Sequence, residues 1–396
     1  MPSRMPNGEV ARLAIAQALA GANSGVAYAS GSIIGHELAP QPTLATLPIS
    51  IFVIGMAAST LPVGALTRRY GRKPAFFVGN LLGVASSLVA AAALLVASFW
   101  LFCLAMLLGG AYAAIVLTFR FAATECVEAG AQAQAISTVL VGGVAAGIVG
   151  PQLTTATMDL WPGHAYVVTY VAAAVVAVLS ALVLAGGRFR RAVPASQQTG
   201  GRPVGEILRQ PQLIVAMLCG LVSYMMMNFM MTSAPLAMQL CGISPVYSNY
   251  GIEMHIVAMY APSFFTGRLV TRFGAPNVIM AGLALIALAA ATGLAGITLQ
   301  HFWIALVLLG LGWNFGWVGA SSLVVASHTK EEGPRVQSIN DFFVFGSMVI
   351  GSFVSGSLLT AYGWSLVSGL IFPPVVLAAL GVLWLRRARA AANAAA

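Results

Sequence analysis

The chain has 396 residues, of which 59% are hydrophobic. Only 7% are charged, whereas a typical soluble domain has roughly 25% charged residues. So few charges cannot cover a water-soluble surface, which excludes an ordinary soluble protein and makes lipid the main solvent of the chain. The net charge is +9, but the basic residues form short clusters between apolar runs, so we expect no nucleic-acid partner.

Twelve apolar stretches follow one another along the chain, each near the roughly 20 residues that a helix needs to cross a bilayer. They lack the period-two alternation of membrane strands. We therefore predict an all-α integral membrane protein with twelve transmembrane helices. The stretches cover 11–34, 43–66, 75–97, 99–123, 134–158 and 164–186, and then 212–237, 250–269, 277–298, 302–327, 337–361 and 364–385.

The longest polar stretch divides these helices into two sets of six. It predicts an N-terminal six-helix bundle at 1–187, a cytoplasmic linker at 188–211 and a C-terminal six-helix bundle at 212–396. Basic residues follow every second predicted helix, and none lies in a loop assigned to the outside. Since cytoplasmic loops are rich in Lys and Arg, both termini are expected in the cytoplasm.

A short motif occurs once in each half, after the second and the eighth predicted helix. Both copies read G-x-L-x-x-R-aromatic-G, from Gly64 to Gly71 and from Gly267 to Gly274, with a constant offset of 203. Such a repeat is typical of a carrier that holds its substrate between two bundles. Extended through Arg72 and Lys73, the first copy resembles the signature loop of the major facilitator superfamily. The resemblance implies the major facilitator fold, with two bundles related by a pseudo-two-fold axis, and a gating loop made by Gly64, Arg68, Arg69, Gly71, Arg72, Gly267, Arg272 and Gly274.

Methionine is concentrated in one hairpin of the second half. Nine of the sixteen methionines lie between Met217 and Met259. Met227 and Met231 are four residues apart, as are His255 and Met259, so each pair shares one helix face. A turn near residue 243 would place the two pairs at matching depths. The alternative is that these methionines only fill gaps in the core.

Three thioethers and one imidazole are ligands that suit Cu(I), because Zn²⁺ prefers thiolate, imidazole and carboxylate. The spacing alone indicates only a soft-metal site, and His255 has the alternative of hydrogen bonding a neighbouring helix. The combination M-x-x-x-M and H-x-x-x-M resembles the signature of the CcoA-like copper importers. That resemblance implies import of copper across the bacterial inner membrane for the assembly of haem–copper oxidase. Copper is then a transported substrate, no organic cofactor is expected, and the partners are membrane lipid and copper chaperones.

Other polar groups in the helices suggest supporting roles. Cys219 and Cys241 are candidates for a thiol relay that hands copper on, although buried cysteine often serves only as a small hydrophobe. Arg120 is expected to anchor a cytoplasmic gate with Glu125 or Glu128, and Asp341 is a candidate coupling or gating group.

Three functions remain open from the sequence. The first is copper import, the second is transport of an organic solute or drug with the methionines lining an adaptable pocket, and the third is a membrane copper sensor or assembly factor. The chain has no Walker-type phosphate loop, and no hydrolase constellation stands out, so we expect a secondary carrier rather than an ATPase or an enzyme.

Overall fold

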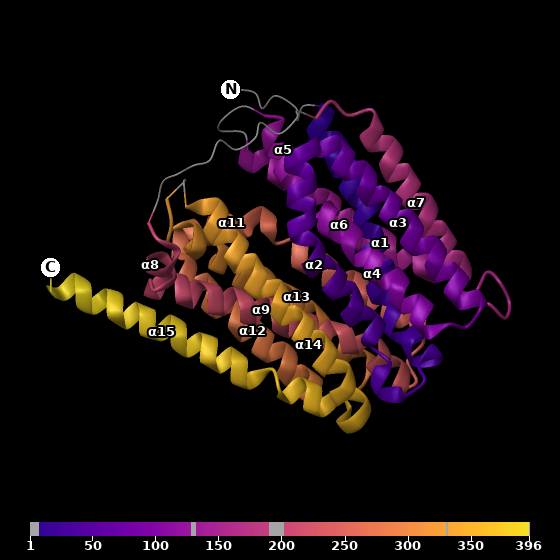
Figure 1. Ribbon diagram of the computed structural model, residues 1–396. Coiled ribbons are helices and arrows are strands. Elements are labelled where there is room, and N and C mark those ends of the chain that lie inside the picture. The colour runs from indigo at the N-terminus through magenta and orange to yellow at the C-terminus, as the bar shows by residue number, and fades with distance from the viewer. Residues whose placement is uncertain (1–7, 128–131, 190–201, 330–331, 396) are drawn as a thin grey trace.

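Helices form the regular structure of the protein throughout the residues that the computed structural model describes, which are 8–127, 132–189, 202–329 and 332–395. The first half runs from indigo to magenta in Figure 1, and the second half from orange to yellow. The two halves lie side by side, and residues 190–201 of the polar stretch predicted as a linker lie outside the described residues.

The first half contains six membrane passages. The fourth predicted passage is divided into α4 and α5, because the helix is interrupted at residues 117–118. A short 3₁₀ turn, η1, precedes α2. The elements are α1 (Gly8–Leu38), η1 (Pro42–Leu44), α2 (Leu47–Tyr70), α3 (Arg72–Leu95), α4 (Phe99–Val116), α5 (Phe119–Glu125), α6 (Gln132–Thr157) and α7 (Val167–Ala185).

The second half repeats this plan with two local differences. Pro262 stands between α10 and α11, where a proline cannot continue the backbone hydrogen bonds of a helix. Gly363 has a φ of 79° inside α14, so the eleventh passage ends there and the twelfth begins. The elements are α8 (Val204–Leu208), α9 (Pro211–Leu240), α10 (Pro245–Tyr260), α11 (Ser263–Phe273), α12 (Ala275–Ala295), α13 (Leu299–Val325), α14 (Gly333–Gly369) and α15 (Phe372–Ala395).

The helices have the length and hydropathy needed to cross a bilayer. In the described part of the chain, nine stretches meet both criteria, and one of these, 339–388, contains two passages that meet at Gly363. The remaining passages are α1, which carries Asn23 and several serines, and the pair α10–α11. The prediction of an all-α membrane fold with twelve passages is thus confirmed.

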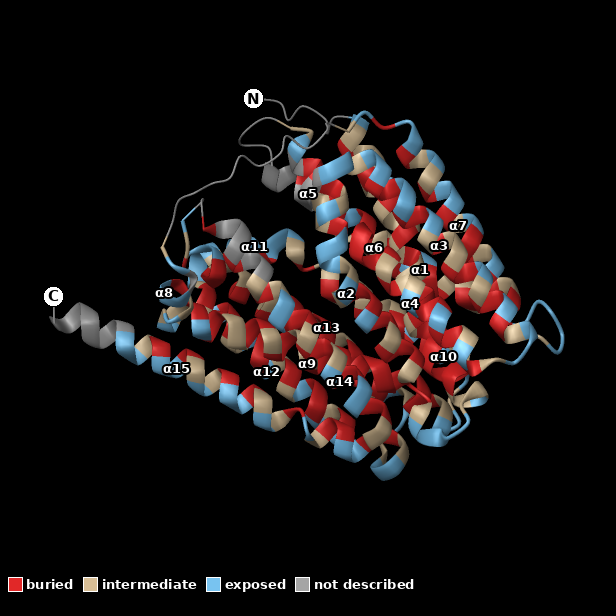
Figure 2. Ribbon diagram, viewed as in Figure 1, coloured by how far each residue is buried: buried red, intermediate tan, exposed pale blue. Residues whose placement is uncertain are grey.

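Each half packs around its own buried cluster of apolar side chains. In Figure 2 buried residues gather inside the two bundles, whereas α15 has exposed and intermediate residues along its outward side. Many of the exposed side chains are Leu, Ile, Val and Trp, as expected for a surface solvated by lipid. The two halves touch through α1 and α9, α2 and α14, and α6 and α10.

The two ends of the molecule differ in how closely the halves approach. We name the end where α2 and α11 finish the basic end, because Arg69, Arg72 and Arg272 lie there. At the opposite end, Gln152 of α6 donates a hydrogen bond to Glu253 of α10 over 2.6 Å.

Further contacts at that opposite end support the same closure. Nδ2 of Asn249 donates to Oγ1 of Thr155 over 2.9 Å, and the Oγ atoms of Ser50 and Ser352 are 3.1 Å apart. These contacts close the opposite end, while a large cavity lies between the halves toward the basic end.

Candidate functional site

A central cavity lies between the halves, with a volume of about 840 Å³ including the space open to solvent. Helices of both halves supply its walls, so a bound molecule would contact both. Its polar side chains include Gln17, Ser24 and Tyr28 of α1. None of its described lining residues is charged. Its larger side chains are Phe52, Met56, Tyr224, Met227, Met231, Ile256, Met259, Tyr260 and Met348.

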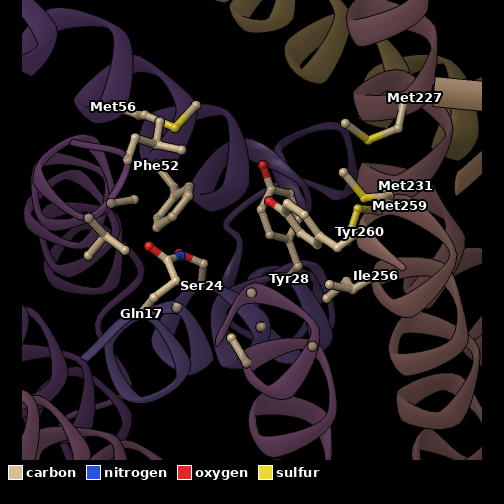
Figure 3. A pocket seen from close by; sticks show the side chains of 18 of the residues that line it. Gln17, Ser24, Tyr28, Phe52, Met56, Met227, Met231, Ile256, Met259 and Tyr260 are labelled. Atoms are coloured by element: carbon tan, nitrogen blue, oxygen red, sulfur yellow. The ribbon is translucent and has the colours of Figure 1, made fainter. Parts of the chain in front are cut away.

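The three predicted methionine ligands come together at this cavity. Met227 and Met231 of α9 and Met259 of α10 all line it. In Figure 3 their thioethers project from the same wall, across the cavity from Gln17 and Phe52. The i, i+4 spacing on α9 therefore places both sulfur atoms on the face predicted from the sequence.

His255 lies apart from this wall, since it is fully buried and does not line the cavity. Its Nδ1 lies 2.7 Å from the carbonyl oxygen of Leu306 on α13. A carbonyl oxygen only accepts, so Nδ1 carries the proton and Nε2 keeps a lone pair. Nε2 is buried without a hydrogen-bond partner among the described residues.

The faces of α10 explain why His255 and Met259 diverge. Ile252, His255 and Met259 are buried and follow a three-then-four spacing, and His255 of this stripe bonds α13. Ile256, Met259 and Tyr260 form the adjoining face that lines the cavity. Met259 lies where the two faces meet, whereas His255 lies on the α13 side.

The two cysteines of the predicted relay lie in different surroundings, because one is buried and the other is exposed. Cys219 is fully buried, and its Sγ lies 3.9 Å from the carbonyl oxygen of Ala378 on α15. Cys241 is exposed at the end of α9. Neither side chain lines the central cavity. A relay would need both thiols to be reachable from the cavity, whereas in this conformation Cys219 faces the outer helix α15. The thiol relay stays a prediction.

The repeated glycine–arginine motif makes the same turn twice. Gly71 and Gly274 have φ values of 89° and 81°, a region that residues with a Cβ rarely adopt, and each joins two helices directly. Gly64 and Gly267 lie inside α2 and α11. The arginine of each copy packs on the next aromatic ring.

Those cation–π pairs have nearly equal geometry. The guanidinium carbon of Arg69 lies 5.3 Å from the ring centroid of Tyr70, and that of Arg272 lies 5.2 Å from the centroid of Phe273. The side chain of Arg68 lies outside what the structure describes. The gating role of this loop stays a prediction.

The expected pairing of Arg120 with Glu125 is not the one that forms. Glu125 instead forms an ion pair with Arg72, with 2.6 Å between Nη2 of Arg72 and Oε1 of Glu125. Arg72 begins α3 and Glu125 ends α5, so this ion pair binds two helices of the first half. The other expected partner, Glu128, lies outside the described residues.

Arg120 lines a second cavity, between the central cavity and the basic end. This second cavity encloses about 1440 Å³ including the space open to solvent. Five aromatic residues of the second half line it, namely Tyr224, Tyr260, Trp313, Trp317 and Phe345. The two cavities share Gln17, Leu117, Gly143, Tyr224 and Tyr260.

The sequence predictions missed the aromatic residues of the second cavity. The signal for them was weak: Trp313 and Trp317 share a helix face through their spacing of four. Nothing in their spacing distinguishes a cavity wall from a lipid-facing wall.

Comparisons with known proteins agree with this architecture. The family profile of the Major Facilitator Superfamily matches residues 13–261 and 218–396. The riboflavin transporter RfnT of Brucella anthropi is 43% identical over 368 residues, with 92% of each chain covered. The uncharacterized MFS-type transporter YdeG of Bacillus subtilis is 27% identical over 382 residues, covering 91% of this chain and 88% of that protein.

Solved structures share the fold. The xylose transporter XylE from E. coli, in a partially occluded inward open conformation, superposes with a TM-score of 0.71 at 13% identity, covering 94% of this chain and 97% of that one. The nucleoside transporter NupG superposes with a TM-score of 0.74 at 12% identity, covering 95% and 99%. With its twelve passages, its repeated loop and its cavity between two halves, the chain belongs to the Major Facilitator Superfamily of membrane transporters.

Proposed function

We propose that the protein is a secondary transporter of a neutral, planar heteroaromatic solute of the riboflavin class. The observation that carries the proposal is the central cavity, which has no charge among its described lining residues and lies between the two halves. The similarity to a protein named a riboflavin transporter supports the choice of solute. Copper import, which the resemblance to the CcoA-like importers implies, becomes the second candidate.

The walls of the central cavity suit a flat ring with polar edges. Methionine thioethers and aromatic rings contact the faces of conjugated rings favourably. Gln17 and Ser24 supply donors and acceptors from one wall, opposite the methionines.

The absence of a lining charge also predicts what the cavity rejects. A phosphorylated flavin would have to leave water for a site that offers no cation, which is costly for a charged group. We expect riboflavin to be carried and flavin mononucleotide to be refused when both are offered from the opposite end. By the positive-inside rule we expect the basic end in the cytoplasm. The transport that we propose is import across a bacterial inner membrane.

The direct cellular test is growth of a bacterial strain that can neither make nor import riboflavin. With the protein expressed, we expect growth at limiting external riboflavin, and no growth when only flavin mononucleotide is supplied. Gln17→Ala should raise the riboflavin concentration needed for growth, whereas Ser357→Ala, at a half-buried serine of α14 that lines neither cavity, should not. Equal growth with and without the protein would refute the proposal.

A specific observation favours copper as the second candidate. His255 donates its Nδ1 proton to a backbone carbonyl and leaves Nε2 unpartnered, which is the arrangement that metal-binding histidines commonly have. The thioethers of Met227, Met231 and Met259 lie at one wall of the cavity. For this candidate the copper ion is the transported substrate, and chaperones of oxidase assembly are its expected partners.

Copper binding is tested with the Met→Leu series, which deletes sulfur and nearly keeps volume. The copper hypothesis predicts that Leu at Met227, Met231 or Met259 abolishes Cu(I) uptake. Met226→Leu is the matched control, since Met226 is buried on α9 but does not line the cavity. Binding of Cu(I) without uptake into vesicles would instead support a sensor or assembly factor.

A further inference from the structure

We propose that the second cavity is a binding station for an aromatic anion that enters from the basic end, a planar ring that carries a phosphate. The choice of ring rests on the proposed riboflavin-class function, while the anion preference rests on the second cavity alone. Such a ligand would contact both halves at once, with its ring on the second half and its phosphate near the first.

The second half supplies an aromatic wall for the ring. The indoles of Trp313 and Trp317 are nearly parallel, at 11°, with their centroids 6.4 Å apart. Tyr224 meets both edge-on, at 5.2 Å and 5.1 Å. Tyr260 contacts Trp313 at 6.0 Å. These mutual contacts hold the four rings in place, so a flat ligand finds a preformed stacking surface.

The first half supplies a positive charge. Arg120 lines the second cavity and lies within electrostatic range of Tyr224, Tyr260 and Asp341. A guanidinium binds phosphate through two parallel hydrogen bonds. Ser263 and Ser321 also line this cavity. Ser263 accepts a hydrogen bond from Asn314, so its own hydroxyl proton is free to donate.

Asp341 and Arg120 should have opposite effects on the binding of an anion. Its carboxylate lies near Arg120 and accepts a hydrogen bond from Asn340 over 3.2 Å. A phosphate that reaches Arg120 therefore competes with Asp341 and is repelled by it. Removing the carboxylate should strengthen anion binding, whereas removing the guanidinium should weaken it. General damage to the fold would not give opposite changes.

The position of the station has a consequence for transport. The two cavities share Gln17, Tyr224 and Tyr260, so an occupant of the second cavity stands in the exit path of a solute from the central cavity. Because it touches both halves in this conformation, it would also stabilise the state that is closed at the opposite end. A phosphorylated flavin on the basic side should therefore slow uptake.

The binding test uses purified full-length protein and flavin mononucleotide, measured by isothermal titration, with riboflavin and inorganic phosphate as comparison ligands. We expect Arg120→Gln to weaken flavin mononucleotide binding about tenfold or more, as for loss of a charged hydrogen bond. Asp341→Asn should tighten it, and riboflavin affinity should change less than twofold in both variants. Arg188→Gln, which removes the same charge from an exposed position after α7, is the matched control.

The sidedness test uses proteoliposomes of known orientation. Flavin mononucleotide on the basic side should slow uptake of the carried solute, and the same concentration on the other side should not. Equal affinities of wild type, Arg120→Gln and Asp341→Asn, or inhibition from the opposite side only, would overturn the proposal. The titration does not depend on which solute is carried, so lack of riboflavin transport would refute the proposed function without deciding this one.

Discussion

The hydroxyl of Tyr28 on α1 donates a hydrogen bond to Oδ1 of Asn228 on α9 over 3.2 Å, across the boundary between the halves. The amide of Asn228 in turn donates to the carbonyl of Met348 on α14 over 3.2 Å. The ring of Tyr28 lines the central cavity and packs edge-on against Phe52 at 5.7 Å. Tyr28 therefore both lines the central cavity and helps to hold the two halves together.

Removing that hydrogen bond should shift the balance between conformations. Tyr28→Phe keeps the ring but deletes the donor, which costs the closed state about 1 kcal/mol, or roughly a fivefold change in the population ratio. Accessibility of Ser50→Cys to an impermeant maleimide, in a chain without its native cysteines, should rise. Tyr170→Phe is the control, because that hydroxyl bonds Ser30 within the first half. Unchanged labelling of both variants would contradict the role of the contact.

Closure of the opposite end depends on a glycine of α14. A Cβ added to Gly356 would collide with Thr46 at the start of α2. Gly356→Ala should therefore disfavour the closed state by roughly 1–3 kcal/mol, as overpacking does, and slow transport at normal abundance. Gly346→Ala on the same helix has open space around the added Cβ and should be silent.

The same position offers a rescue experiment. Thr46→Gly removes the atoms that the new methyl group meets, so the double variant should recover much of the transport rate. If Gly356→Ala were fully active, or if the double variant were no better than the single one, this contact would not limit closure.

An ion pair fastens the segment before α9 to the start of α14. Glu332 is 4% exposed, and Arg202 binds it through its side chain and its backbone N–H, each at 2.9 Å. The Arg202 side chain, with the N–H groups of Arg202 and Thr329, holds the pKa of Glu332 far below its usual range. A depressed folded-state pKa stabilises the fold above the unfolded pKa of about 4.3, and this stabilisation is lost as pH falls further.

We therefore expect Glu332→Gln to lower the Tm at pH 7. The difference from wild type should shrink steadily as the pH falls below about 4. Thermal unfolding in detergent between pH 3 and pH 8 checks this. Asp159→Asn, at an exposed site near the opposite end, should leave the Tm nearly unchanged at every pH. A deficit that is independent of pH would show that the carboxylate charge is not what matters.

The three methionines that line the central cavity should each contribute a small part of the affinity for the proposed solute. Each of Met227→Leu, Met231→Leu and Met259→Leu keeps an apolar wall but loses the sulfur–ring contact, worth about 0.3–1.5 kcal/mol. Riboflavin affinity, measured by quenching of its fluorescence on the purified protein, should fall by up to about tenfold per site, and Met226→Leu should match wild type. Unchanged affinity in the triple Leu variant would remove these methionines from the flavin site.

The sequence predicted the parts of the protein that depend on local pattern. Twelve passages, the repeated loop after the second and eighth passages, and the common wall of Met227 and Met231 all follow from apolar length, motif and helical spacing. The position of His255 does not, because its partner, the Leu306 carbonyl, lies 51 residues away on α13. Residues four apart share a helix face. Which of them contacts the cavity and which contacts α13 is decided by the packing of α10 between α6, α9 and α13.

Long-range pairing limited the other predictions as well. Arg72 and Glu125 are 53 residues apart, and no spacing rule relates them. Cys219 has the same helix and the same apolar surroundings in the sequence as the cavity methionines. Only the structure places it against Ala378 of α15.

Transport of a neutral riboflavin-class solute is tested by uptake of labelled riboflavin and of Cu(I) into proteoliposomes. Both are measured with the same preparation of purified protein, and each is compared with empty liposomes. We predict saturable riboflavin uptake that unlabelled riboflavin competes away, and copper uptake no greater than in empty liposomes. Accumulation of copper without riboflavin, lost when Met227, Met231 and Met259 are changed to Leu, would contradict the claim and establish the copper alternative.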